Sequence, residues 1–274
     1  MTRRMIEIDG LKLALSDSGG AGRPIVLQHG LTADAGQIAE FFPGSPDWRV
    51  LTLECRGHGS SETGDPAAFS IAAFADDVAA AMAAAGVSRA VVGGVSMGAA
   101  IACRLAVIRP DLVEALVLIR PAWVVDAAPE NMAPNAEVGE LITRFGAGAG
   151  LAAFERSATA ARLAEVAPDN LASLKSMFGR VPADVTAALT TRISADGPGI
   201  SAEQLRGVVV PALIVGTKRD AIHPLGLAET LASSLPNARF AEITPKASSK
   251  PAYLADLAAA IDRFLSDLTR DVTP

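Results

Sequence analysis

The segment VVGGVSMGAA, residues 91–100, places Ser96 between two glycines at the end of a short apolar run. That run, residues 90–95, has the length of a buried strand, and residues 99–108 favour a helix. A Gly-x-Ser-x-Gly pentapeptide between a strand and a helix is typical of a nucleophile elbow, whose tight and strained turn exposes the serine hydroxyl. The pattern predicts Ser96 as an attacking nucleophile. The alternative is that serine stands there only because a small residue fits the turn.

Apolar runs of strand length recur along the chain and alternate with helix patterns. The first two are separated by Asp9-Gly10, which predicts an antiparallel hairpin. Between Ser70 and Gly86, apolar residues at helical spacing predict a helix capped by these two residues. Such alternation predicts a doubly wound α/β fold, with a mostly parallel sheet behind the hairpin. We expect strands at residues 5–8, 11–15, 25–28, 50–53, 90–95, 115–119, 212–215 and 239–243, and a closing helix from Pro251.

Residues 124–201 interrupt the alternation, because they contain no convincing strand pattern. The clearest helix-length pieces cover residues 136–145, 150–160 and 182–192. A helical insertion between two strands of such a sheet lies over the carboxyl edge, where ligands bind. We therefore predict an α/β core formed by residues 1–123 and 202–274, with a helical cap or lid at 124–201.

Composition argues against several classes of function. Of the 274 residues, 50% are hydrophobic and 20% charged, so a sizeable core is expected. The formal net charge is −6 and no basic cluster occurs, which disfavours nucleic-acid binding. No window has the roughly 20-residue apolar run of a membrane span, and residues 1–10 lack the apolar segment of a signal peptide. Two cysteines are too few for a disulfide framework, so we expect a cytoplasmic protein.

Metal and cofactor motifs are missing from the sequence. Cys55 and Cys103 have no partners at metal-ligand spacing, and no dinucleotide-binding or phosphate-cradling glycine loop is present. We therefore expect no metal and no cofactor, and a small-molecule substrate. The sequence does not indicate an oligomeric state.

Three motifs follow consecutive predicted strands at one edge of the sheet. They are Gln28-His29-Gly30-Leu31, the segment from Glu54 to Ser60 that contains Arg-Gly-His-Gly, and the elbow at Gly94–Gly98. In this order they resemble the α/β-hydrolase family, and the resemblance covers nearly the whole chain. It implies a hydrolase acting on a small carboxylic ester, thioester or lactone through a serine nucleophile.

The resemblance also implies roles for other residues. It places the oxyanion hole on the backbone N–H groups of Leu31 and Met97, which would bind the charge developing on the attacked carbonyl oxygen. Asp220 follows the strand at 212–215, where the family carries the acid that orients the base. Its alternative is an ordinary turn or capping residue. His29 and His58 belong to motifs whose histidines mostly brace their loops, and His29 is also counted among the substrate-binding candidates.

The catalytic base is not where the family has it. The loop after the last strand, residues 244–251, contains no histidine. His223 lies three residues after Asp220 and either reaches Ser96 or merely braces its loop. Lys246 is the other candidate, but a lysine acts as a base only when burial or positive charge lowers its pKa. A neighbouring Asp220 would instead raise that pKa, which favours a surface lysine or a carboxylate-binding cation.

Arg120 ends the strand at 115–119 and leads into the insertion. A charge at the end of a buried strand is costly unless it is paired. It either binds a substrate carboxylate or forms an ion pair with an acid of the insertion such as Asp126 or Glu130. Trp123 is expected to line the pocket roof or to fill the interface between cap and core.

Two further interpretations remain open. Without the family's histidine, the same pocket could serve a lyase, a proton-transfer enzyme or a small-ligand receptor, in which Ser96 only donates a hydrogen bond. A histidine could also have been substituted, with Ala247 or Ser248 standing at its position.

Overall fold

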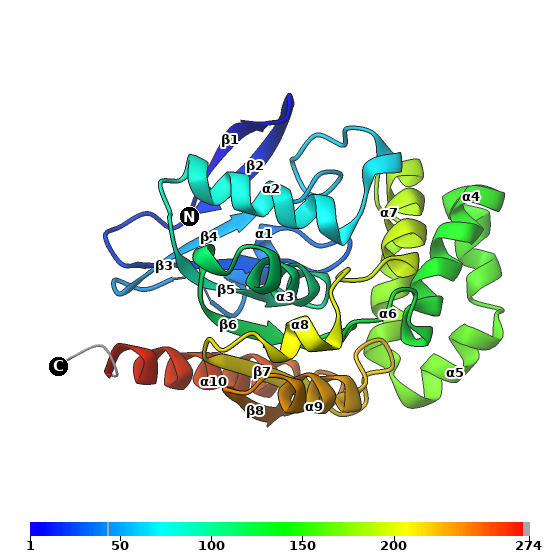
Figure 1. The fold of residues 1–274 in the computed structure, drawn as a ribbon. Coiled ribbons are helices and arrows are strands. Elements are labelled where there is room, and N and C mark those ends of the chain that lie inside the picture. Colours follow the sequence, from blue (N-terminus) through cyan, green and yellow to red (C-terminus); the bar gives the residue numbers. More distant parts are fainter. Residues whose placement is uncertain (43, 271–274) are drawn as a thin grey trace.

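The computed structural model describes residues 1–42 and 44–270, and an eight-stranded sheet forms its centre (Figure 1). The strand order is β1-β2-β4-β3-β5-β6-β7-β8. Strands β3 to β8 run parallel to one another, whereas β2 is antiparallel to both β1 and β4. The predicted α/β fold with a leading hairpin is confirmed. The strands are β1 Thr2–Ile8, β2 Leu11–Asp17, β3 Arg23–Gln28, β4 Trp48–Leu53, β5 Ala90–Val95, β6 Val113–Ile119, β7 Ala212–Thr217 and β8 Ala238–Ile243.

Helices cover both faces of the sheet, as Figure 1 shows, and each face has its own apolar core. On one face pack α2 (Ile71–Ala84), α3 (Met97–Ile108), α8 (Ala202–Arg206) and α9 (Leu225–Ser234). The other face is covered by α1 (Ala35–Ala39) and α10 (Lys250–Arg270). The predicted cap of α2 is present, because the Ser70 side chain accepts a hydrogen bond from the Ala73 N–H group. Short 3₁₀ helices cover Pro66–Ala68, Pro110–Leu112 and Glu130–Met132.

The segment between β6 and α8 is helical wherever it is regular. It contains α4 (Ala133–Phe154), α5 (Ala158–Val166), α6 (Pro168–Met177) and α7 (Ala183–Ala195), which lie together beyond one end of the sheet (Figure 1). The single helix expected at 150–160 is wrong, because α4 ends at Phe154 and Ser157 caps a new helix by accepting from the Ala160 N–H group. Helix α6, which begins at Pro168, was not expected from the apolar spacing.

None of the helices in the described ranges is both long enough and apolar enough to cross a membrane.

Candidate active site

Ser96 occupies a sharp turn between β5 and α3. Its φ is 57° and its ψ is −110°, a conformation that costs a non-glycine residue free energy and persists only where the surroundings impose it. The Ser96 N–H donates to the Ile119 carbonyl at 2.9 Å, which ties the turn to β6. A Cβ atom at Gly98 would lie 2.3 Å from the Gln28 carbonyl oxygen, so the turn tolerates no side chain there. Glycine is therefore required at position 98 because the backbone of Gln28 lies against it.

Two backbone N–H groups beside Ser96 have no hydrogen-bond acceptor in the described ranges. Met97 is the first residue of α3, where N–H groups have no acceptor within the helix. Leu31 follows Gly30, whose N–H donates to Gln37 Oε1 at 2.7 Å and so orients the loop after β3. Over residues 1–42 and 44–270, neither the Leu31 nor the Met97 N–H group donates a hydrogen bond. These are the two donors that the resemblance implied.

A cavity of about 110 Å³ opens above Ser96, between the carboxyl edge of the sheet and the helical segment. Core elements contribute one wall and helices α4 and α6 the other. The polar residues that line it are Gln37, Ser96, Arg120, Asn135, Asp169, Asn170, Ser173, His223 and Lys246. Apolar contacts come from Leu31, Val95, Met132, Leu174, Met177 and Ile222.

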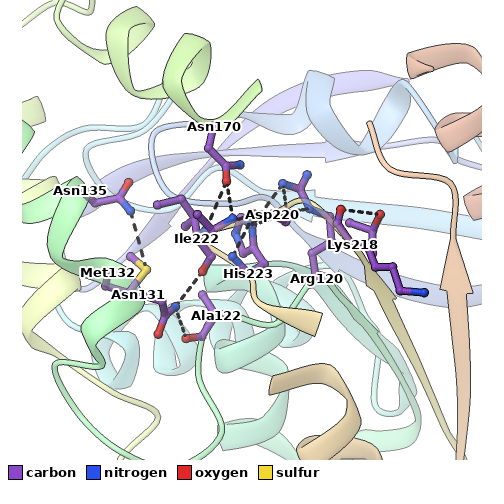
Figure 2. A network of polar contacts seen from close by, with 12 residues as sticks. Arg120, Ala122, Asn131, Met132, Asn135, Asn170, Lys218, Asp220, Ile222 and His223 are labelled. Carbon is purple, nitrogen blue, oxygen red and sulfur yellow. Dashed lines mark hydrogen bonds and ion pairs between the residues drawn. The ribbon is translucent and has the colours of Figure 1, made fainter. Parts of the chain in front are cut away.

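Asp220, His223 and Arg120 form one buried polar network at this cavity (Figure 2). Arg120 donates from Nε to Asp220 Oδ2 at 2.7 Å, and its Nη2 lies 2.5 Å from the same oxygen. The other oxygen, Oδ1, accepts from the His223 backbone N–H at 2.9 Å. Arg120 therefore pairs with a carboxylate of the core, and not with Asp126 or Glu130 of the insertion, because β6 and β7 are neighbours and end at the same edge.

The His223 ring faces Asp220 through Nδ1, which lies 3.0 Å from each carboxylate oxygen. An ionised carboxylate only accepts hydrogen bonds, so this contact is favourable when Nδ1 carries the proton. Nε2 then has the free lone pair that a general base needs. Burial lowers the pKa of His223, an effect that the Asp220 charge opposes and the Arg120 charge reinforces.

Asp220 is held in its ionised form. Burial by itself would raise the pKa of this carboxyl, but the charges of His223 and Arg120 hold it well below its usual range. Only 2% of its side chain is exposed. Asp220 is thus a permanent negative charge that orients the His223 imidazole.

Lys246 lies at the mouth of the cavity and forms no ion pair within the described part of the chain. Partial burial and the nearby charges of Arg120 and Lys250 lower the pKa of its ammonium group. The expectation that Asp220 would raise this pKa is wrong, because Arg120 and His223 already surround that carboxylate. Lys246 therefore meets one physical condition for a base.

Neither candidate base is hydrogen-bonded to Ser96. In the described ranges, the Ser96 hydroxyl makes no hydrogen bond to His223, to Lys246 or to any other residue. All three side chains nevertheless line the same cavity.

Asparagines of the helical segment, which the sequence analysis missed, fix the loop that carries Asp220 and His223. Asn170 Oδ1 accepts from the Ala221 N–H at 2.7 Å and from the Ile222 N–H at 3.3 Å. Asn131 donates to the Ile222 carbonyl at 2.7 Å, as Figure 2 shows. Only an approximate helix pattern marks this region, and no spacing rule identifies asparagines that contact a loop 50 residues or more away.

Three other residues considered in the sequence lie outside the cavity wall. His29 is fully buried, with Nδ1 2.9 Å from the Gly30 carbonyl and Nε2 accepting from the Cys55 N–H at 3.1 Å. His58 stacks near it, with ring centroids 4.8 Å apart. Trp123 is buried between core and insertion and donates from Nε1 to the Asp196 carbonyl at 2.9 Å. These side chains brace the loops around the site, and neither His29 nor Trp123 lines the cavity above Ser96.

Across the described ranges, no group of three or more His, Cys, Asp or Glu side chains is placed to hold a metal ion.

Comparison with known proteins points to one fold family. A sequence model described as alpha/beta hydrolase fold matches residues 23–247. A putative non-heme bromoperoxidase BpoC of Mycobacterium tuberculosis is 28% identical, over 83% of this chain and 87% of that protein. A putative carbamate hydrolase RutD of Klebsiella pneumoniae is 23% identical, over 85% and 87%. The crystal structure of the enol-lactonase from Burkholderia xenovorans superposes with a TM-score of 0.73 and 25% identity, covering 96% of this chain and 100% of that chain.

Proposed function

Because the chain belongs to the α/β-hydrolase fold family, we propose that it hydrolyses small carboxylic esters, thioesters or lactones with Ser96 as nucleophile and His223 as base. Hydrolase-type relatives support the reaction class. One observation carries the finer assignment: a single cavity brings together Ser96, the Leu31 loop and a histidine held by an ionised aspartate. The helical segment, as a lid over that cavity, would exclude water from the reacting groups.

The proposed reaction follows from this arrangement. Ser96 Oγ forms a bond to the carbonyl carbon while its proton passes to His223 Nε2. The negative charge on the carbonyl oxygen is bound by the N–H groups of Leu31 and Met97. The bond to the leaving oxygen or sulfur then breaks, and His223 returns the proton to that atom. Water attacks the acyl-enzyme by the same route, releasing the acid and restoring Ser96.

Proton transfer needs one further event, because no hydrogen bond joins Ser96 to His223 in the unliganded protein. A bridging water or a shift of the His223 ring on substrate binding would supply the contact, and catalytic hydrogen bonds often tighten only with substrate bound. The missing hydrogen bond between Ser96 and His223 also favours a second candidate function, in which the pocket binds a ligand or moves a proton without covalent catalysis by Ser96.

A fluorophosphonate probe distinguishes these two functions, because it reacts with serines whose hydroxyl is activated. We expect stoichiometric labelling of Ser96 in the folded protein, located by peptide mass spectrometry. Urea-unfolded protein and a Ser96→Ala variant serve as controls and should not be labelled. Absence of labelling in folded protein, with the cavity intact by crystallography, would favour the non-covalent function.

The pH dependence of kcat/KM distinguishes the two bases. Burial lowers the pKa of His223 from its usual 6.5, and a base acts only when deprotonated, so activity should stay level above that usual value and fall only at lower pH. With Lys246 as base, the loss of activity on acidification should begin at higher pH, because the pKa of this group is lowered from a usual value of 10.5. Lys246→Met should leave the acid limb in position. An alkaline limb that disappears in Lys246→Met would assign the base to Lys246.

A further inference from the structure

Asp169 is a carboxylate of the cavity wall that the proposed reaction does not use. It lies in the first turn of α6, and its Oδ1 atom is buried without a hydrogen-bond partner. In the described part of the chain, no hydrogen bond or ion pair to either of its oxygens is found. A buried acceptor left without a donor is costly, and nearly all buried polar atoms in proteins have a partner from the protein, from ordered water or from a bound ion.

The position of Asp169 is set by its neighbour in the sequence. Asn170 binds two consecutive backbone N–H groups of the loop that carries Asp220 and His223. These hydrogen bonds hold the start of α6 against the loop that carries Asp220 and His223, as the position of Asn170 in Figure 2 shows. Asp169 is close enough that its charge acts on both His223 and Lys246. The backbone that carries Asp169 is therefore anchored to the loop of Asp220 and His223.

Lys246 supplies the opposite charge at the same cavity. It forms no ion pair in the described ranges; the charges of Arg120 and Lys250 repel it, and those of Asp169 and Glu40 attract it less strongly. Asp169 and Lys246 both line the cavity but form no ion pair with each other in the described ranges. The cavity thus presents one unpaired acceptor on the helical side and one unpaired cation on the core side.

From these two unpaired groups we infer that the substrate is a small dipolar acyl compound, with a hydrogen-bond donor for Asp169 and a carboxylate for Lys246. The inference rests on the proposed hydrolase function and names its substrate class. Esters in which a side hydroxyl of an amino acid or of a dihydroxy acid is acylated have both groups, because the carboxylate stays free and the donor is the ammonium or the remaining hydroxyl. The cavity of about 110 Å³ favours small acyl compounds of this kind.

A set of acetate esters tests each group separately. Propyl acetate has neither group, 3-acetoxypropylammonium has only the donor, and 4-acetoxybutanoate has only the carboxylate. The compounds 4-acetoxy-2-aminobutanoate and 4-acetoxy-2-hydroxybutanoate have both, and they differ in the donor. We expect kcat/KM for one of the last two to exceed that for propyl acetate by roughly 100-fold, since a buried polar site rejects a substrate lacking its partner.

Variants assign the preference to its residues. Asp169→Asn should lower kcat/KM roughly 10- to 100-fold for donor-bearing esters only, and Lys246→Met should do so for carboxylate-bearing esters only. Asp184→Asn, an exposed aspartate in the first turn of α7, and Lys12→Met, an exposed lysine, are the matched controls. Equal activity on all five esters, or equal losses on propyl acetate, would overturn the inference.

A binding measurement separates this inference from the proposed function. In the Ser96→Ala variant, calorimetry should detect 2-aminobutanoate or 2-hydroxybutanoate, and adding Asp169→Asn should remove the signal. If no ester is hydrolysed but this binding is found, the hydrolase proposal fails and the ligand class stands. If esters are hydrolysed without such binding or preference, the ligand class fails alone.

Discussion

Ser96→Ala is expected to lower kcat for ester hydrolysis by at least about 10⁴-fold, because removal of an attacking serine from such a unit has effects of this size or larger. The residual rate would come from the N–H groups of Leu31 and Met97, which the substitution leaves in place. Alanine is smaller than serine, so the turn at φ 57° should remain folded. Steady-state kinetics with an ester substrate at neutral pH, together with a circular dichroism spectrum, make the measurement.

Ser248→Ala is the matched control for this experiment. Ser248 is exposed in the loop after β8, where the sequence analysis considered a substituted histidine. Its replacement should leave kcat within a factor of two. A Ser96→Ala variant that retained more than a tenth of the activity would show that the nucleophile lies elsewhere.

The fold was predictable because its signals are local. The strand at residues 90–95 matches β5 residue for residue, since an apolar run bounded by a turn and a glycine elbow has no other regular structure available. Strand β8 was predicted from residue 239 and begins at Ala238. Strands β1, β3, β4 and β6 begin two or three residues before the predicted start, and the errors in the helices fall in the insertion. There, alanine-rich segments favour helix almost everywhere, and the breaks at Ser157 and Pro168 are set by packing and capping.

The site was predictable only where one motif contains the whole feature. Ser96 and the Leu31 loop belong to such motifs. The ion pair between Arg120 and Asp220 joins residues 100 positions apart, through the adjacency of β6 and β7. A single sequence does not specify which buried acid meets which buried arginine. The lowered pKa of Lys246 has the same origin, because it depends on Arg120 and Lys250 converging on one loop.

The second large expected effect is on stability. Arg120→Met should lower the free energy of unfolding by about 3–5 kcal/mol, because it leaves Asp220 as a buried carboxylate without its guanidinium partner. Their side chains are 11% and 2% exposed, so solvent compensates little. Urea denaturation at pH 7, followed by circular dichroism, gives the measurement. Arg109→Met, which breaks the exposed pair with Asp111, is the matched control and should change stability little.

The pH dependence of this loss identifies its cause. In the native protein the pKa of Asp220 is depressed, so its stabilising contribution is present above the pKa of the unfolded chain, about 3.9, and is lost as pH falls through the folded value. In Arg120→Met the carboxyl can protonate at higher pH and no longer needs a cation. The difference in unfolding free energy between variant and native protein should therefore shrink as pH falls from 7 towards 4.

The double variant Arg120→Met/Asp220→Asn should recover much of the stability at pH 7, because it removes the unpaired charge. If the loss of stability were constant with pH and unchanged in the double variant, its cause would be lost packing around the Arg120 side chain.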